Sequence, residues 1–307
     1  MQAVVYKSTG SWYVVKNQEG HVFNARIKGK FKIENITSTN PIAVGDVVEI
    51  ENEQDAESTV ITTIYERKNY INRVSPHNPN LHHIVASNIQ QAMLFATLKE
   101  PKTSLGFIDR FLITAEAYDI PAIIVFNKMD LFGEKEEEQL ALIRQIYEPI
   151  GYTIQCISLS ENKGVDAVEE SLKDKVTLLS GHSGVGKSTF INRLFPSLSL
   201  KTQEVSESSG KGMHTTTFAE MFDLPFGGQI IDTPGIREMG LVNIAKQELA
   251  HYFPEMRHRM NDCQFNNCKH INEPGCAVKF AVNEGAIHPE RYFSYLNILD
   301  SIVEKKY

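Results

Sequence analysis

The sequence predicts a multidomain α/β protein made of three parts: a small N-terminal β-barrel, a central doubly wound sheet and a C-terminal helical domain. Three observations predict this architecture. Short β-like runs separated by turns fill residues 1–70, strands alternate with helices in residues 71–240, and cysteines gather near a histidine in residues 241–307. A chain of 307 residues is long enough for two or three domains.

The N-terminal part contains five short runs of β-forming residues with turn signals between them. Strands at this spacing are typical of a barrel of the OB type, a fold that commonly binds oligonucleotides. A β domain that docks protein is an equal alternative. The basic stretch Arg26–Lys32 favours RNA slightly, because it places four charges beside one aromatic ring. The expected strands are Ala3–Tyr6, Ser11–Lys16, His21–Ala25, Asp46–Ile50 and Ser58–Tyr65.

Residues 67–87 are polar and include His77, His82 and His83. No accompanying cysteine or carboxylate completes a metal-ligand set with these histidines, so we interpret the stretch as a polar linker.

From Asn88 the pattern changes to strands that alternate with helices, which predicts a doubly wound, mostly parallel sheet. The run Ala122–Phe126 is fully apolar, as expected for a parallel strand covered on both faces. Further strands are expected at Ala92–Leu98, Tyr152–Ile157, Val176–Ser180, Thr217–Leu224 and Gln229–Ile231, and helices at Leu105–Tyr118, Glu134–Tyr147 and Val165–Leu172.

The loop after Val176–Ser180 matches the phosphate-binding pattern, in which four residues separate two glycines and Lys and Ser follow. Such glycines let backbone N–H groups surround phosphate oxygens at a helix N-terminus. We expect Lys187 to reach the β- and γ-phosphates and Ser188 to bind Mg²⁺. The nucleotide-binding residues expected here are Gly181, His182, Ser183, Gly184, Val185, Gly186, Lys187, Ser188 and Thr189.

A second box, Asn127-Lys128-Met129-Asp130, follows the apolar strand, where ligands of open α/β sheets bind. An ionised Asp130 accepts from both N1–H and N2–H₂ of guanine, a pair of bonds that adenine does not offer, so the box predicts a guanine nucleotide. Lys128 is expected to lie over the base and Asn127 to brace the phosphate loop. A backbone contact to guanine O6 is expected after the next strand, in Ser158-Leu159-Ser160, with Ser158 and Leu159 as the residues expected to bind.

The polar stretch Ser199–Thr217 is long for a loop in a compact domain, so we expect a switch that orders around the γ-phosphate and Mg²⁺. Thr216 is the preferred metal ligand, with Thr215 next. The later sequence Asp-Thr-Pro-Gly indicates that Asp232 holds Mg²⁺ through water and that the N–H of Gly235 meets the γ-phosphate.

Ile236 stands where many GTPases carry the Gln that orients the attacking water. Isoleucine cannot do this, so His214, beside the switch threonines, is the local candidate for that catalytic role. The catalytic residues expected are His214, Lys187 and Thr216.

The order of the boxes is unusual. In ordinary GTPases the Asn-Lys-x-Asp box comes after the phosphate loop and the Asp-x-x-Gly box, but here it precedes both, at 127 against 181 and 232. The order indicates a circularly permuted GTPase domain, whose chain runs from the second switch directly into the C-terminal part.

The C-terminal part holds Cys263, Cys268, His270 and Cys276, a complete tetrahedral ligand set for one zinc ion with no open position for water. This predicts a structural zinc site. The flanks Asn243–Phe253 and Pro289–Val303 are expected to be helical. The aromatic residues Tyr292, Phe293 and Tyr295 could stack on RNA bases, but a helical stripe favours the core.

Composition narrows the class further. The chain has no run of 18 apolar residues and no signal peptide, which predicts a cytoplasmic protein without disulfides or membrane contact. The net charge is −7, and the acidic excess lies in the central part because residues 1–74 and 241–307 are neutral. Any RNA contact therefore needs local basic patches.

Together these residues resemble the ribosome small-subunit-dependent GTPases of the RsgA (YjeQ/YloQ) family. The resemblance rests on the permuted box order, the Gly-Lys-Gly-Met-His-Thr-Thr-Thr stretch, Asp-Thr-Pro-Gly and the Cys-x4-Cys-x-His-x5-Cys cluster. It implies GTP hydrolysis stimulated by the small ribosomal subunit during late assembly, with rRNA contacts and release of an assembly factor. We also expect the protein to be a monomer. The histidine before the threonines matches His214, and Ile236 agrees with the family's hydrophobic residue.

Two other functions stay open. In the first, nucleotide clamps the barrel and the zinc domain onto RNA with negligible turnover. In the second, the protein is a GTPase that regulates a metabolic enzyme. Measuring GTP turnover on the subunit distinguishes the clamp from a hydrolase. Partner binding that is insensitive to salt and ribonuclease favours the regulator of a metabolic enzyme.

Overall fold

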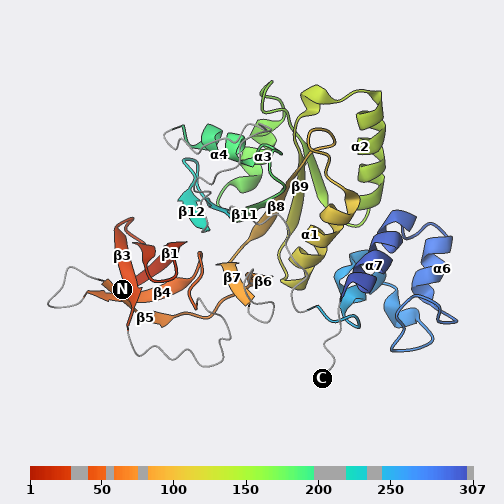
Figure 1. Ribbon diagram of the computed structural model, residues 1–307, viewed down its shortest axis with the longest axis horizontal. Helices are drawn as coiled ribbons and strands as arrows, with labels where there is room; N and C mark the ends of the chain where they lie inside the picture. Colours follow the sequence, from red (N-terminus) through yellow and green to blue (C-terminus); the bar gives the residue numbers. More distant parts are fainter. Residues whose placement is uncertain (29–40, 53–58, 75–81, 197–218, 234–243, 303–307) are drawn as a thin grey trace, which may run out of the picture.

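A computed structural model of the chain describes residues 1–28, 41–52, 59–74, 82–196, 219–233 and 244–302 (Figure 1). The N-terminal part is a five-stranded barrel, which confirms the predicted OB-type architecture. The strand order is β1-β2-β3-β5-β4, and an additional pairing of β1 with β4 closes the sheet. Alternate side chains of the barrel strands, among them Val5, Val15 and Ile50, fill one core. The strands are β1 (Gln2–Ser8), β2 (Tyr13–Asn17), β3 (Val22–Ile27), β4 (Val47–Asn52) and β5 (Thr59–Ile64).

The expectation of a plain linker at 67–87 is wrong. Strands β6 (Tyr70–Val74) and β7 (His82–Ser87) form an antiparallel two-stranded sheet, and His82 and His83 belong to β7. The physical reason is burial, since Ile71 and Ala86 are almost fully buried in the core of the central domain. His77 lies outside the described residues.

A buried carboxylate connects this hairpin to the barrel. Asp46 is fully buried, and its carboxylate accepts from Arg67 at 2.6 Å and from the Ser87 hydroxyl at 2.6 Å. The turn before it needs glycine, because Gly45 has a φ of +91° and a Cβ there would lie 2.1 Å from the carbonyl oxygen of Ser87.

The central sheet has the order β10-β9-β8-β11-β13-β12, in which all neighbours are parallel except β12 and β13. Separate apolar cores lie on its two faces, one with α1 and α2 and the other with α3 and α4, so the predicted doubly wound sheet is confirmed. The strands are β8 (Gln91–Ala96), β9 (Ala122–Phe126), β10 (Thr153–Cys156), β11 (Val176–Ser180), β12 (Glu220–Asp223) and β13 (Gln229–Asp232), and the helices are α1 (Leu105–Ala117), α2 (Glu134–Tyr147), α3 (Val165–Leu172) and α4 (Lys187–Leu194).

The barrel is attached to the edge of this sheet. Strand β1 pairs antiparallel with β12 at Lys7 and Glu220, whose side chains also form an ion pair at 3.1 Å. Asp223 accepts from the Tyr6 hydroxyl at 2.6 Å and from Lys16 at 2.5 Å. These polar contacts across the junction are joined by apolar ones, since Val4 and Tyr6 of β1 also pack against the core of the central domain.

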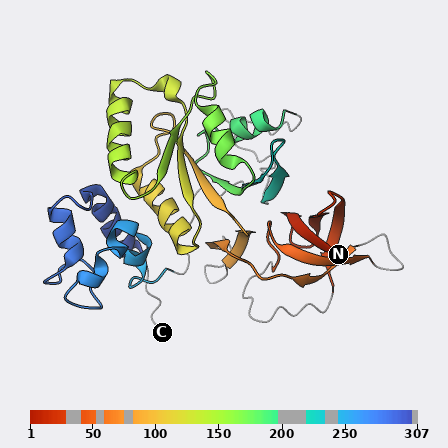
Figure 2. The same cartoon turned by 180° about the vertical axis from the view of Figure 1, so that it is seen from behind.

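The C-terminal part packs against α1, on the side of the central domain away from the barrel (Figures 1 and 2). Its last helix agrees with the prediction, but the flank expected to be helical at 243–253 contains only the short 3-10 helix η2 within the described residues. Tyr295 is buried in the core, whereas Phe293 is 61% exposed. The elements are η2 (Leu249–Tyr252), α5 (Pro254–Arg257), η3 (Met260–Asp262), α6 (Ala277–Asn283) and α7 (Pro289–Ser301).

Among the helices in the described ranges, none has the length and apolar character that crossing a membrane requires.

Candidate functional site

The sequence-predicted nucleotide residues meet at one edge of the central sheet. Parallel strands β9, β10, β11 and β13 end there, so Asn127, Ser158, Gly181 and Asp232 emerge side by side although 105 residues separate the first from the last in sequence. Crevices at the carboxyl ends of such strands are where doubly wound sheets bind ligands.

The phosphate loop, residues 181–186, joins β11 to α4 and requires glycine at both ends. Gly181 has a φ of +137°, and a Cβ there would lie 2.2 Å from the carbonyl oxygen of Phe95. Gly186 has a φ of +104°, and a Cβ there would lie 2.2 Å from the side-chain amide nitrogen of Asn127. The loop therefore packs directly on β8 and on the residue that follows β9.

Lys187 points into this loop. Its ammonium group donates to the carbonyl oxygens of Gly181 at 2.5 Å and His182 at 2.8 Å. Burial lowers the pKa of Lys187, and the charge of Asp232 opposes that shift. Burial likewise raises the pKa of Asp232, and Lys187 opposes it. The two groups are thus partly buried opposite charges, and each offsets the effect of burial on the pKa of the other.

Asn127 links the phosphate loop to the base end of the site. Its side chain, almost fully buried, donates to the carbonyl oxygen of Val185 at 2.9 Å and accepts from the N–H of Leu159 at 3.3 Å. One amide thus fixes the loops after β9, β10 and β11 relative to one another.

Asp130 is exposed and oriented by a buried hydroxyl. The Ser158 hydroxyl donates to the Asp130 carboxylate at 2.5 Å and lies 2.9 Å from the Ser160 hydroxyl. The hydrogen bond from Ser158 is the main reason that the pKa of Asp130 is lowered. The carboxylate is therefore held ionised, in the state that accepts two hydrogen bonds from a guanine edge.

Lys128 has a contact that the sequence did not indicate. Its backbone is left-handed, with a φ of +68°, and its ammonium group donates to the carbonyl oxygen of Glu100. Glu100 belongs to the loop between β8 and α1. Since β8 is a central strand, that loop must lie at the same edge of the sheet, and this topological argument was the only available signal.

A second missed contact involves the phosphate loop itself. The ring of His182 stacks on the ring of Phe107, in the first turn of α1, with 3.8 Å between the centroids and 28° between the planes. Helix α1 therefore supports the phosphate loop from the side.

Other predicted residues are placed less informatively. Ser183 and Thr189 are exposed, Gly184 and Ser188 are partly exposed, and Met129 begins the short 3-10 helix η1 (Met129–Leu131). The switch residues lie outside the described residues, and these are His214, Thr215, Thr216, Gly235 and Ile236.

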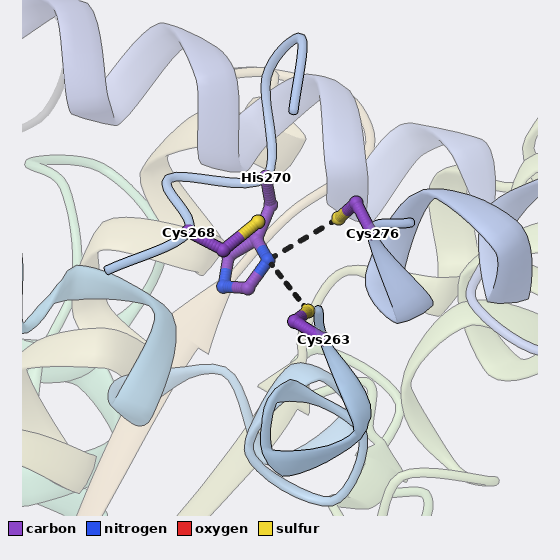
Figure 3. Close-up of side chains that lie close together, drawn as sticks. All are labelled: Cys263, Cys268, His270 and Cys276. Atoms are coloured by element: carbon purple, nitrogen blue, oxygen red, sulfur yellow. Dashed lines mark hydrogen bonds between the residues drawn. The ribbon is translucent and has the colours of Figure 1, made fainter. Parts of the chain in front are cut away.

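The structure brings the four predicted metal ligands together in the C-terminal part (Figure 3). The ligand atoms of Cys263, Cys268, His270 and Cys276 all lie within 4.8 Å of one another. Nδ1 of His270 is 3.6 Å from the sulfur of Cys263 and 3.4 Å from that of Cys276. Burial raises the pKa of the Cys268 thiol to about 12. Three thiols gathered around one imidazole suit a metal cation, which stabilises their thiolate forms.

The chain around the ligands is held by second contacts. Glu273 accepts from the backbone N–H groups of Lys269, Ile271 and Asn272. Burial alone would raise the pKa of Glu273, but these bonds outweigh it and lower the pKa to about 2. Tyr292 and Tyr295 of α7 donate to the carbonyl oxygens of residues 270 and 269. The cluster is therefore fastened to α7.

Comparison with protein families gives two matches that together span most of the chain. The model described as RsgA N-terminal domain matches residues 2–60, and the model described as RsgA GTPase matches residues 64–242.

Individual relatives and solved structures agree. The chain is 50% identical over 302 residues to a protein of Flavobacterium psychrophilum named small ribosomal subunit biogenesis GTPase RsgA, which covers 98% of this chain and 93% of the relative. It is 49% identical over 307 residues to the protein of that name from Bacteroides fragilis, covering 100% and 99%. The structure is similar to that of YjeQ from Thermotoga maritima, with a TM-score of 0.81, 32% identity and 99% of both chains covered. It is also similar to YloQ, described as a circularly permuted GTPase, with a TM-score of 0.75, 29% identity and coverage of 100% and 96%.

Proposed function

The chain belongs to the RsgA family of GTPases, and on that premise we propose that it hydrolyses GTP in the biogenesis of the small ribosomal subunit, with turnover stimulated by that subunit. One observation carries the nucleotide assignment. Asn127 binds the phosphate loop directly while Asp130, three residues later, presents an oriented carboxylate at the same edge of the sheet. The phosphate loop and the carboxylate proposed to bind the base are thereby held at a fixed distance from each other.

Each part of the nucleotide has a proposed set of contacts. The amides of residues 181–186 and the ammonium group of Lys187 bind the phosphates, for which Lys187 exchanges its present bonds to two loop carbonyls. Asp130 accepts from the guanine edge, Lys128 lies over the base, and Leu159 contributes its backbone. Ser188, Thr216 and Asp232 would hold Mg²⁺, which neutralises charge on the transferring phosphoryl group when bound.

The attacking water needs a group that orients it. The side chain of Ile236 offers no polar atom, so we assign this role to His214, together with any group that the ribosomal subunit adds. His214→Ala is expected to keep GDP affinity and to lose turnover. A variant that hydrolyses GTP as fast as the unchanged protein on the subunit would remove His214 from the mechanism.

The flanking parts are proposed to deliver the nucleotide domain to its partner. Residues 1–70 form the rRNA-binding barrel, residues 71–240 the permuted GTPase domain and residues 241–307 the zinc domain. Three thiolates and one imidazole are the donor set of a closed structural zinc site, so zinc would stabilise the fold of the last part rather than take part in hydrolysis. We further propose a cytoplasmic monomer that releases an assembly factor from the subunit.

The deciding experiment is GTP turnover by the purified protein alone, with small subunits, and with large subunits as the control. The expected result is that small subunits stimulate GTP turnover and large subunits do not. Intact GDP binding without stimulation would refute the stimulated hydrolase and leave a nucleotide-dependent clamp. Retention of partner binding after ribonuclease treatment and in high salt would point to a protein partner instead.

A further inference from the structure

A fully buried arginine joins the C-terminal part to the central domain. Arg291 of α7 is 1% exposed, and its guanidinium donates to Glu255 of α5 at 2.7 Å and to Asp109 of α1. The hydroxyl of Tyr147 in α2 also donates to Asp109, at 2.8 Å. One guanidinium thus connects two carboxylates that come from different parts of the chain.

Such a network contributes little to the free energy of folding but restricts the relative positions of its members. Burying three charges carries a large desolvation penalty, and apolar replacements of buried ion pairs are often as stable. The planar fork of arginine nevertheless accepts only a narrow range of carboxylate positions. The rings of Phe253 and Tyr147 restrict it further, with centroids 4.6 Å and 5.6 Å from the guanidinium carbon. Arg291 therefore fixes where Asp109, and with it the start of α1, lies.

The same end of α1 touches the phosphate loop. Phe107 precedes Asp109 by two positions, and residues two apart point to different sides of a helix. Accordingly Phe107 stacks on His182 of the loop while Asp109 meets Arg291 of the C-terminal part. Figures 1 and 2 both show α1 lying between the sheet and α7.

We propose that Arg291 is a positioning residue for the nucleotide site: it holds α1 through Asp109, and α1 in turn sets the phosphate loop through the stack of Phe107 on His182. This inference rests on the proposed function, because it takes the loop to bind the phosphates of GTP and GDP. Binding linkage is reciprocal. A partner that moves α7 therefore changes nucleotide affinity, and nucleotide changes the affinity for that partner.

A second ion pair between the C-terminal part and α1 provides the matched control. Arg257 of α5 donates to Glu116 of α1 at 3.1 Å, but both side chains are partly exposed, and Glu116 lies in the last turn of α1, far along the helix from Phe107. Arg257→Ala removes a contact between the C-terminal part and α1 without touching the route to the loop.

The test is a double-mutant cycle on GDP affinity, measured with a fluorescent GDP analogue on the full chain well below the unfolding temperature. Phe107→Leu removes the stacked ring, and Arg291→Lys keeps the charge but loses the planar fork. Each single variant is expected to weaken GDP binding about fivefold. The double variant is expected to bind GDP as well as the single variant with the lower affinity, because both substitutions interrupt the same chain of contacts. Arg257→Ala and Phe107→Tyr are expected to bind as the unchanged protein does.

The outcomes separate the two proposals. The positioning role would be overturned if the two substitutions lowered GDP affinity by independent factors that multiply in the double variant, or if Arg291→Lys left GDP affinity unchanged. In either case, GDP binding by the unchanged protein would leave the proposed function standing. Absence of GDP binding by the unchanged protein would overturn the proposed function itself. If Arg291→Lys does not fold, as judged by circular dichroism, Tyr147→Phe takes its place in the cycle, because it removes only the hydroxyl that donates to Asp109.

Discussion

Replacement of Asp130 by asparagine should change which base the protein binds. The carboxylate offers two acceptors to N1–H and N2–H₂ of guanine, whereas an amide offers one acceptor and turns a donor toward a donor. Hydrogen bonds to a charged group contribute about 1.5–3 kcal/mol each. Losing one and weakening the other predicts a loss of about 3–4 kcal/mol, or about 10²- to 10³-fold in GDP affinity.

The same change should favour xanthine, which has a carbonyl where guanine has N2–H₂. The amide of Asp130→Asn can donate to that carbonyl, so the affinity for xanthosine diphosphate should rise as the affinity for GDP falls. Calorimetric titration of both nucleotides measures the exchange. Asp166→Asn, an exposed position in the first turn of α3, is the matched control and should leave both affinities unchanged.

Ser158→Ala tests the orientation separately. It leaves the Asp130 carboxylate in place but removes the 2.5 Å hydrogen bond that holds it, so a loss of about tenfold in GDP affinity is expected. If Asp130→Asn kept GDP affinity within threefold of the unchanged protein, the assignment of the base site would be wrong.

Further predictions follow from other contacts. Lys187→Ala should abolish GTP turnover, measured as phosphate release, since no other described ammonium group lies inside the phosphate loop. Chelation of the metal, or Cys263→Ser, should increase amide hydrogen exchange in α7, and zinc content by atomic emission should fall with it. Asp46→Ala should lower the free energy of unfolding by about 3–5 kcal/mol in denaturant titration, because Arg67 is left without its buried partner. Burial alone would raise the pKa of Asp223, but its bonds to Lys16 and Tyr6 outweigh it, so the pKa is lowered. The stabilisation is therefore present above the ordinary pKa and lost as the pH falls below about 4. The protection factors of the β1 amides, which compare the observed exchange rate with the intrinsic rate at the same pH, should fall in that range and should fall less steeply in Asp223→Asn.

The sequence predicted those features that depend on local pattern. The apolar run at 122–126 and the strand before the phosphate loop were placed to the residue, because buried parallel strands are continuous in hydrophobicity. The metal ligands were predicted from donor chemistry and spacing alone. The hairpin β6–β7 was missed because its polar flanks hide two core residues, Ile71 and Ala86, whose burial depends on the rest of the domain.

Contacts between distant segments carry no such pattern. Arg291 lies 182 residues from Asp109 in sequence, and neither residue stands in a motif. The stack of Phe107 on His182 joins the start of α1 to the phosphate loop, and the two residues are 75 positions apart in the sequence. The ring that stacks on His182 could not be identified until the order of the strands was known.

The flanking parts reach the nucleotide site by separate routes. The C-terminal part acts on α1 and, through it, on the phosphate loop. The barrel instead pairs with β12, the last strand of the central sheet. Strand β12 pairs in turn with β13, whose last residue is Asp232. Its junction combines the polar contacts of Lys7, Lys16 and Tyr6 with the packing of Val4 and Tyr6 against the core of the central domain. We therefore expect a partner that binds both flanks to act on two points of the site at once, the phosphate loop and the carboxylate proposed to hold Mg²⁺. Binding to one flank should reproduce only part of the stimulation.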